Sequence, residues 1–204
     1  MTAAGPLPAE DCRTVLALAR ESLRAHLRGI DPPPLDVQRL TPGLQRVAAC
    51  FVTLTKNRQL RGCILDSFSA HESIAENVAR NVVLAATADP RFPPVREDEV
   101  DALAIEVSVL GAPYDIDVTT PEDLIARIRP NIDGVILTST LGSSTFLPQV
   151  WQQLPDPVQF LGELCRKHGA PADCWTTDAL LRIQLYQAEH FSDADPKGLS
   201  PPPD

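Results

Sequence analysis

Two apolar segments separated by a short polar one constrain the fold of this chain most. Residues 47–54 and 60–65 each have the length and apolar content of a strand, and only residues 55–59 lie between them. Strands joined at this distance pair antiparallel, because a parallel pair needs a crossover of a dozen or more residues. The sequence therefore predicts an α+β fold built on antiparallel sheet, rather than a purely parallel α/β sheet.

Hydrophobic periodicity places the other elements around this hairpin. Four segments predict helices, because a capping residue or proline comes before apolar residues spaced three or four apart: residues 8–29, 69–88, 120–129 and 156–169. Three further segments predict strands: 103–110, 132–138 and 181–185. In the second helix, Ser69 and Glu72 are the expected capping box. Residues 141–144 predict a turn, and the proline-containing segment 146–151 is not expected to be a simple central strand.

Composition excludes some classes of function. Eighteen Lys and Arg against 27 Asp and Glu give a net charge of −9, which disfavours nucleic acid and anionic lipid surfaces as partners. No apolar run is long enough to span a bilayer, and the N-terminal residues lack the pattern of a secretory signal, so we expect a soluble cytoplasmic protein. The five cysteines form no CxxC pair and are expected to be reduced thiols. The four histidines have no ligand spacing, so we predict neither a metal site nor a cofactor.

Several segments together resemble the signature blocks of the AMMECR domain, in the same order and with similar spacing. The matching blocks are LRGCI (60–64), DPRFPP (89–94), EVSVL (106–110), TFLPQVW (145–151) and LCRKHG (164–169). The resemblance covers residues 7–191 and implies one α+β domain of two sub-parts. The proline-rich residues 192–204 are expected to be a disordered tail. The family has glycine where this chain has Leu65, which puts a close backbone approach at that position in doubt.

The resemblance suggests a pathway more than a reaction. Bacterial and archaeal members are called AmmeMemoRadiSam system protein A and are grouped with a Memo-type protein and a radical-SAM protein. No reaction is attributed to the domain itself. The resemblance therefore predicts an accessory or binding component, whose partners would be a Memo-like protein, a radical-SAM protein or a small-molecule ligand. It leaves the oligomeric state open.

The candidate catalytic residues are Cys63 and Glu106. Side chains alternate along a strand, so Arg61 and Cys63 share one face, and a guanidinium beside a thiol favours the reactive thiolate. Cys63 is then a nucleophile or a thiolate ligand, or alternatively a small buried residue of the strand. Glu106 lies on the non-apolar face of the strand 103–110 and is the strongest candidate for a general base or acid. An enzyme that uses Cys63 is the alternative to the binding hypothesis.

Further polar residues of the matched blocks are expected to bind a ligand. Asp89, Arg91 and Phe92 lie on a proline-rich loop, which can hold side chains at a low entropic cost. Alternatively, Asp89 caps a turn while Phe92 anchors the loop in the core. The full set of predicted ligand-binding residues is Arg61, Gly62, Asp89, Arg91, Phe92, Ser108 and Thr145. If these residues converge on one cleft around Cys63, the prediction of a site gains support.

Overall fold

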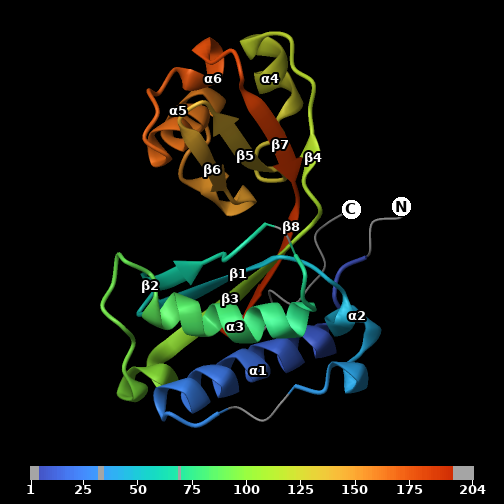
Figure 1. Ribbon diagram of the computed structural model, residues 1–204, viewed down its shortest axis with the longest axis vertical. Coiled ribbons are helices and arrows are strands. Elements are labelled where there is room, and N and C mark those ends of the chain that lie inside the picture. The colour runs from blue at the N-terminus through green and yellow to red at the C-terminus, as the bar shows by residue number, and fades with distance from the viewer. Residues whose placement is uncertain (1–4, 32–34, 69, 195–204) are drawn as a thin grey trace. The chain divides into compact units, whose positions relative to one another are not determined.

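The computed structural model describes residues 5–31, 35–68 and 70–194, which form two compact units (Figure 1). Unit 1 contains the described residues up to Leu110 and from Glu189 onward, and unit 2 spans Gly111–Ala188. Both units combine helices with an antiparallel sheet, which confirms the predicted α+β class. Within the described ranges, no helix is both long and apolar enough to cross a membrane.

Unit 1 is a four-stranded sheet with order β2-β1-β3-β8. Its helices are α1 (Ala9–Leu27), α2 (Pro42–Gln45) and α3 (Ile74–Thr87), with 3₁₀ turns η1 (Val37–Arg39) and η2 (Glu97–Ala102). Its strands are β1 (Cys50–Lys56), β2 (Gln59–Ile64), β3 (Leu103–Leu110) and β8 (Ala188–Ser192). The predicted hairpin is confirmed: β1 and β2 pair antiparallel, and Asn57 and Arg58 form the turn with positive φ angles of 53° and 63°.

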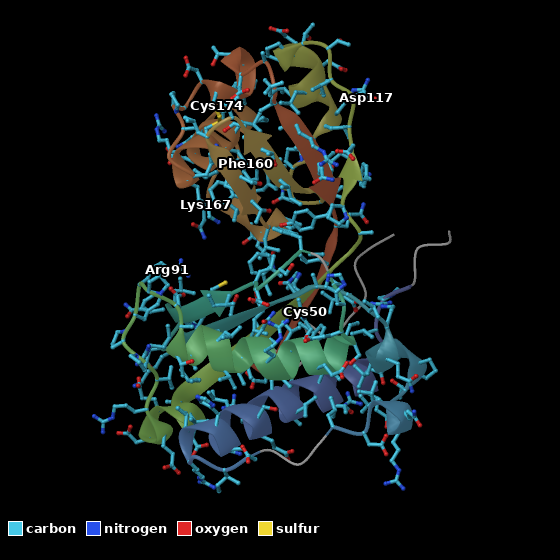
Figure 2. The ribbon with its side chains drawn as sticks, viewed as in Figure 1. Cys50, Arg91, Asp117, Phe160, Lys167 and Cys174 are labelled. Carbon is cyan, nitrogen blue, oxygen red and sulfur yellow. A yellow bond between two sulfur atoms is a disulfide. The ribbon has the colours of Figure 1, made fainter. Side chains whose placement is uncertain are left out.

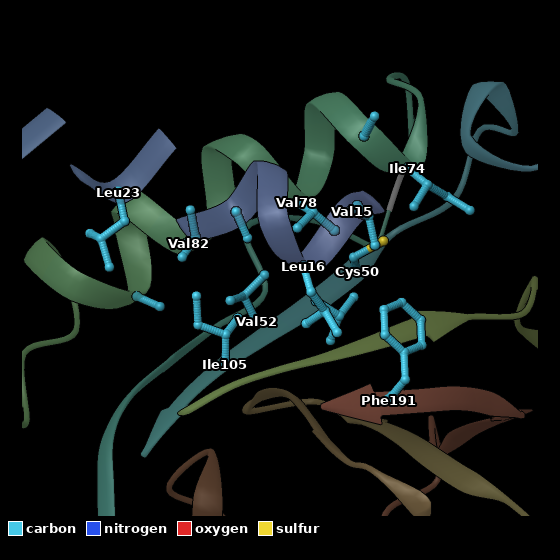
Figure 3. Close-up of a cluster of buried hydrophobic side chains, with 14 of the residues drawn as sticks. Val15, Leu16, Leu23, Cys50, Val52, Ile74, Val78, Val82, Ile105 and Phe191 are labelled. Atoms are coloured by element: carbon cyan, nitrogen blue, oxygen red, sulfur yellow. The ribbon is translucent and has the colours of Figure 1, made fainter. Parts of the chain in front are cut away.

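The core of unit 1 lies between its sheet and the helices α1 and α3 (Figures 1 and 3). Val52 of β1 and Ile105 of β3 point into this core together with Val15 of α1 and Val78 of α3, and all four are fully buried. Each buried aliphatic side chain contributes about 1.5–3 kcal/mol. Because strand side chains alternate, the residues between these apolar positions face away from the helices. Those residues carry the candidate site.

Helix α3 begins later than predicted. Its N-cap is Ser73, whose side chain forms a capping box with Glu76, whereas Ser69 lies outside the described residues. The amide of Ile74 donates to the carbonyl of Arg46 (2.8 Å), and Val47 forms a β-bridge with Ser73. These contacts with the segment before β1 fix the start of the helix, so tertiary pairing decides between two similar Ser-x-x-Glu patterns.

Unit 2 is a second four-stranded sheet with order β4-β7-β5-β6, with helices packed against it. Its strands are β4 (Tyr114–Asp115), β5 (Gly134–Ser139), β6 (Gly142–Phe146) and β7 (Arg182–Tyr186). Its helices are α4 (Pro121–Arg127), α5 (Pro157–Lys167) and α6 (Cys174–Thr177), with the 3₁₀ turn η3 (Pro148–Gln152). The chain turns at Leu141 as predicted, but residues 142–144 of the predicted turn belong to β6, which pairs antiparallel with β5. This edge strand is partly polar and therefore lacks an apolar run that would identify it.

The expectation of five reduced cysteines is also wrong. Cys165 and Cys174 form a disulfide that joins α5 to α6, with their Cα atoms 6.2 Å apart (Figure 2). Both residues are buried in the core of unit 2, as the apolar position of Cys165 suggests. Residues nine positions apart meet only because the chain reverses between the two helices, and no spacing motif reveals this. Cys12, Cys50 and Cys63 are not in a disulfide.

The folded part of unit 1 extends two residues beyond the predicted boundary at residue 192. Ser192 is the last residue of β8. The carboxylate of Asp193 accepts hydrogen bonds from the amide of Ile105 and the guanidinium of Arg20. Composition suggests a tail here because Asp193 is charged. Its carboxylate, however, forms an ion pair with Arg20 of α1 and accepts a hydrogen bond from Ile105 of β3. Residues 195–204 of the predicted tail lie outside the described residues.

Candidate functional site

Three strands of unit 1 place Cys63, Thr53 and Glu106 in one row. Thr53 of β1 is the register partner of Cys63 on β2 and of Glu106 on β3. All three residues are on the sheet face that points away from α1 and α3. The hydroxyl of Thr53 lies 3.2 Å from the Cys63 sulfur. The two predicted catalytic residues therefore share a face, with a hydroxyl between them that the sequence analysis does not identify.

Gly62 allows the strand that carries Cys63 to approach helix α3. A Cβ atom at position 62 would lie 2.0 Å from the carbonyl oxygen of Ala85, which is backbone and cannot move aside cheaply. Glycine is therefore required by the close approach of β2 and α3. Its role in this structure is to position Cys63, and no other site function is needed to explain it.

The carboxylate of Asp89 fastens the proline-rich loop to the edge of β2. Its Oδ2 accepts from the amide of Cys63 (2.9 Å) and from Nη2 of Arg91 (2.7 Å), while its Oδ1 accepts from the amide (3.1 Å) and Nε (2.9 Å) of Arg91. A carboxylate has about four lone-pair positions, and protein donors occupy all of them. The hydrogen bonds from Arg91 lower the pKa of Asp89 to about 2, although burial opposes this shift. Asp89 thus holds the loop, as the alternative interpretation of this residue expects.

Arg91 is the cation beside Cys63. Its Nη2 atom lies 3.4 Å from the Cys63 carbonyl oxygen, and its guanidinium lies over the Phe92 ring at 5.6 Å from the centroid. The pKa of Arg91 is raised, first by the hydrogen bonds from its side chain to Asp89 and further by the neighbouring sulfur of Cys63. Its side chain remains 55% exposed (Figure 2). Arg91 can therefore contact both Cys63 and a bound molecule.

Arg61 makes different contacts from those expected. Its guanidinium forms an ion pair with Glu99 (3.0 Å) and donates to the carbonyl oxygens of Pro93 (2.7 Å) and Pro94 (3.2 Å). Lys56 contacts the same carboxylate, and the hydrogen bonds from Arg61 and Lys56 lower the pKa of Glu99 to about 2. Arg61 thus anchors the loop with most of its donors. It also borders a shallow hollow of about 480 Å³ that is lined by Lys56, Phe92, Pro93, Pro94, Arg96, Asp98 and Glu99.

Glu106 is a half-buried carboxyl on β3. Burial raises its pKa, and the nearby His190 opposes this shift. A raised pKa favours the protonated form of the carboxyl, which can donate a hydrogen bond. Ser108 lies two positions further along β3, is buried, and is the register partner of Phe51.

The structure brings together most of the predicted residues, but not all. Arg61, Gly62, Cys63, Asp89, Arg91 and Phe92 meet where β2, the end of α3 and the proline-rich loop come together. Glu106 and Ser108 belong to the same sheet, two strands from Cys63. Thr145 belongs to unit 2, where its hydroxyl donates to the Val135 carbonyl (2.9 Å). Among the described residues, no cluster of three or more metal-ligating side chains occurs.

Sequence analysis misses Thr53 and Glu99. Thr53 follows the alternation of β1, in which Phe51, Thr53 and Thr55 occupy the positions between buried residues, so the period of two could identify it. Glu99 lies in a run of acidic residues that gives no sign of its pairing with Arg61.

Comparisons with known proteins agree with this architecture. A profile of the AMMECR1 family matches residues 16–191. A protein of Methanothermobacter thermautotrophicus is 36% identical over 192 residues, which is 91% of this chain and 96% of the relative. A protein of Thermococcus onnurineus is 35% identical over 195 residues, which is 90% of this chain and 91% of the relative. The crystal structure of an uncharacterized protein from Pyrococcus horikoshii is similar at a TM-score of 0.82, with 34% identity and coverage of 93% and 94% of the two chains. This chain therefore belongs to the AMMECR1 family.

Proposed function

We propose that this chain is a binding or accessory component, and that the sheet face around Cys63 contacts its ligand or partner. The observation that carries the proposal is the spacing of the row. Adjacent strands lie about 4.8 Å apart, so the backbones at Cys63 and Glu106 are roughly 10 Å apart. A general base must lie within about 3.2 Å of the proton that it removes. Thiol and carboxyl at this spacing, with Thr53 between them, suit recognition of one molecule better than direct proton transfer.

The chemistry of the row limits what would bind. It offers a thiol, a hydroxyl and a carboxyl with a raised pKa, together with the exposed guanidinium of Arg91. Such a set suits a polar molecule, or a polar segment of a partner, that presents both hydrogen-bond donors and an acidic group. The family resemblance supports a Memo-type or radical-SAM protein as the partner, acting with this chain in the cytoplasm.

Binding to purified partners tests the proposal. Memo-type and radical-SAM proteins from the same organism are titrated against the full chain by calorimetry. Cys63→Ser, Thr53→Val and Glu106→Gln should each weaken binding at least several-fold. Glu21→Gln, an exposed change on the opposite side of unit 1, is the matched control and should leave binding unchanged. Equal affinity of all four variants for a bound partner would refute the proposed surface, and the absence of any binding would refute these partners.

A thiol-dependent enzyme is the second candidate, favoured by Arg91 beside the Cys63 sulfur. Native alkylation should be selective for Cys63, because Cys12 and Cys50 are buried and burial raises their pKa values to about 11 and about 12. A neighbouring unit charge is worth about 1 kcal/mol in an exposed setting, or roughly fivefold in thiolate population. A thiolate with a lower pKa is also a weaker nucleophile, and this cancels about half of the gain in the logarithm of the alkylation rate.

Arg91→Ala should therefore slow iodoacetamide alkylation of Cys63 about two- to threefold at pH 7. Arg61→Ala should change the rate less, because the guanidinium of Arg61 donates to Glu99, Pro93 and Pro94, whereas that of Arg91 contacts Cys63. Mass spectrometry of the alkylated peptide gives both rates. If native Cys63 reacts no faster than a cysteine in an unstructured peptide and is indifferent to Arg91, the enzyme candidate is eliminated.

A further inference from the structure

A cluster of two serines and one histidine lies in unit 2, whereas the residues of the proposed binding face belong to unit 1. Ser139 is the last residue of β5, Ser144 lies on β6, and His168 is the C-cap residue of α5. The hydroxyl oxygen of Ser139 is 2.9 Å from Nε2 of His168, and that of Ser144 is 2.9 Å from Nδ1. The imidazole is thus held at both ring nitrogens.

The hydrogen bonds assign the proton on the neutral imidazole. The Ser144 hydroxyl has a single proton and donates it to the carbonyl of Leu164 (2.6 Å). In its contact with His168, the Ser144 hydroxyl must therefore accept a hydrogen bond, so Nδ1 of His168 carries the proton. Nε2 is then the unprotonated nitrogen and accepts the hydroxyl proton of Ser139. This is the geometry of a nucleophile next to its general base, with the base oriented by a third group.

We propose that Ser139 is an activated nucleophile that is acylated by carboxylic esters. Ser139 Oγ forms a bond to the ester carbonyl carbon while its proton passes to Nε2 of His168. The bond from that carbon to the alcohol oxygen then breaks, and the departing oxygen takes the proton from Nε2. Water repeats the same exchange, releasing the carboxylic acid and restoring the Ser139 hydroxyl. Ser144 acts as a positioning residue through its contact with Nδ1.

The surroundings of Ser139 indicate the class of substrate. Leu141, whose amide donates to Ser139 Oγ (3.2 Å), leaves its side chain 63% exposed, and Leu180 is 73% exposed. Asp178 accepts from the amide and hydroxyl of Thr140 and from the amide of Leu180, so the two loops that carry these leucines are joined. Ser139 is itself 9% exposed, and the exposed side chain of Leu141, two residues further along the chain, suits an apolar acyl group. The Leu141 amide donates to Ser139 Oγ itself and so does not serve as an oxyanion-hole donor, and we expect slow turnover of activated esters rather than cleavage of amides.

Labelling of the intact chain with a fluorophosphonate probe tests this proposal. Mass spectrometry should locate the probe on Ser139, and p-nitrophenyl acetate should release a burst approaching one equivalent of p-nitrophenolate. Ser139→Ala should abolish both signals. His168→Asn retains a donor near the position of Nδ1 but lacks Nε2, and should slow labelling at least about 100-fold. Ser143→Ala is the matched control on the same hairpin, because its hydroxyl bonds to Thr138 (3.0 Å) rather than to His168.

Ser144 needs a readout that separates positioning from folding. Ser144→Ala should slow labelling about five- to tenfold, the value of one hydrogen bond, and Ser144→Thr should restore it. The fluorescence of the two tryptophans, both in unit 2, shows whether each variant is folded. If His168→Asn does not fold, His168→Gln replaces it. Labelling that is absent, that persists in Ser139→Ala, or that is indifferent to the folded His168 variant would overturn the proposal.

Discussion

Replacing Asp89 by asparagine separates the structural role of this residue from a role in ligand binding. The substitution removes the charge that pairs with Arg91 and leaves an amide group facing the donors that the carboxylate accepts. The Asp89 side chain is only 2% exposed, so water replaces few of these contacts. The loop should then lose its attachment to the edge of β2.

The size of the effect follows from the pKa of Asp89. The hydrogen bonds from Arg91, and those from the amides of Cys63 and Arg91, lower its pKa from 3.8 to about 2 on folding. This shift corresponds to roughly 2 kcal/mol of stability at neutral pH. Because the folded state has the lower pKa, this stability is complete well above pH 3.8 and is lost as the pH falls towards 2. At pH 3 about half of it remains.

Urea unfolding at pH 7 and pH 3 measures this contribution. Both tryptophans and both tyrosines lie in unit 2, so tryptophan fluorescence reports unit 2 alone, whereas far-UV circular dichroism follows the helices of both units, of which α1 and α3 are the longest. The matched control is Asp98→Asn, which breaks an exposed ion pair with Arg96 and should cost less than about 1 kcal/mol. The reasoning fails if Asp89→Asn costs no more than the control, or if its cost is the same at both pH values.

Three further changes test the architecture. Gly62→Ala should destabilise unit 1 by about 1–3 kcal/mol, because the added Cβ would collide with the backbone of Ala85. The thermal midpoint should fall by several degrees. Gly5→Ala is the control and should have little effect, because the space around its Cβ is open. Reducing the Cys165–Cys174 disulfide should cost about 2–3 kcal/mol in the fluorescence transition of unit 2, since it closes a short loop; an unchanged midpoint would contradict this. Asp193→Ala should cost about 1–3 kcal/mol by circular dichroism, whereas a negligible cost would mean that residue 193 is not anchored.

The sequence by itself determines the elements whose signals are local. The β1–β2 hairpin, α1, β3 and α5 are readable because apolar spacing, capping residues and turn length all act over a few neighbouring residues. The alternation of β3 likewise places Glu106 on the face opposite its apolar residues, and that of β2 places Cys63 on the same face as Arg61. These predictions need no knowledge of which strands are neighbours.

Tertiary structure decides the contacts that join distant segments. Only strand order shows that Thr53 lies between Cys63 and Glu106, and only the path of the loop shows that Arg91, rather than Arg61, neighbours the thiol. The Cys165–Cys174 disulfide and the His168 cluster likewise depend on how α5 packs against its neighbours. Local periodicity shows on which face of a strand or helix a side chain lies. The residues that contact this side chain are set by chain reversals and packing, and no short segment of sequence encodes these.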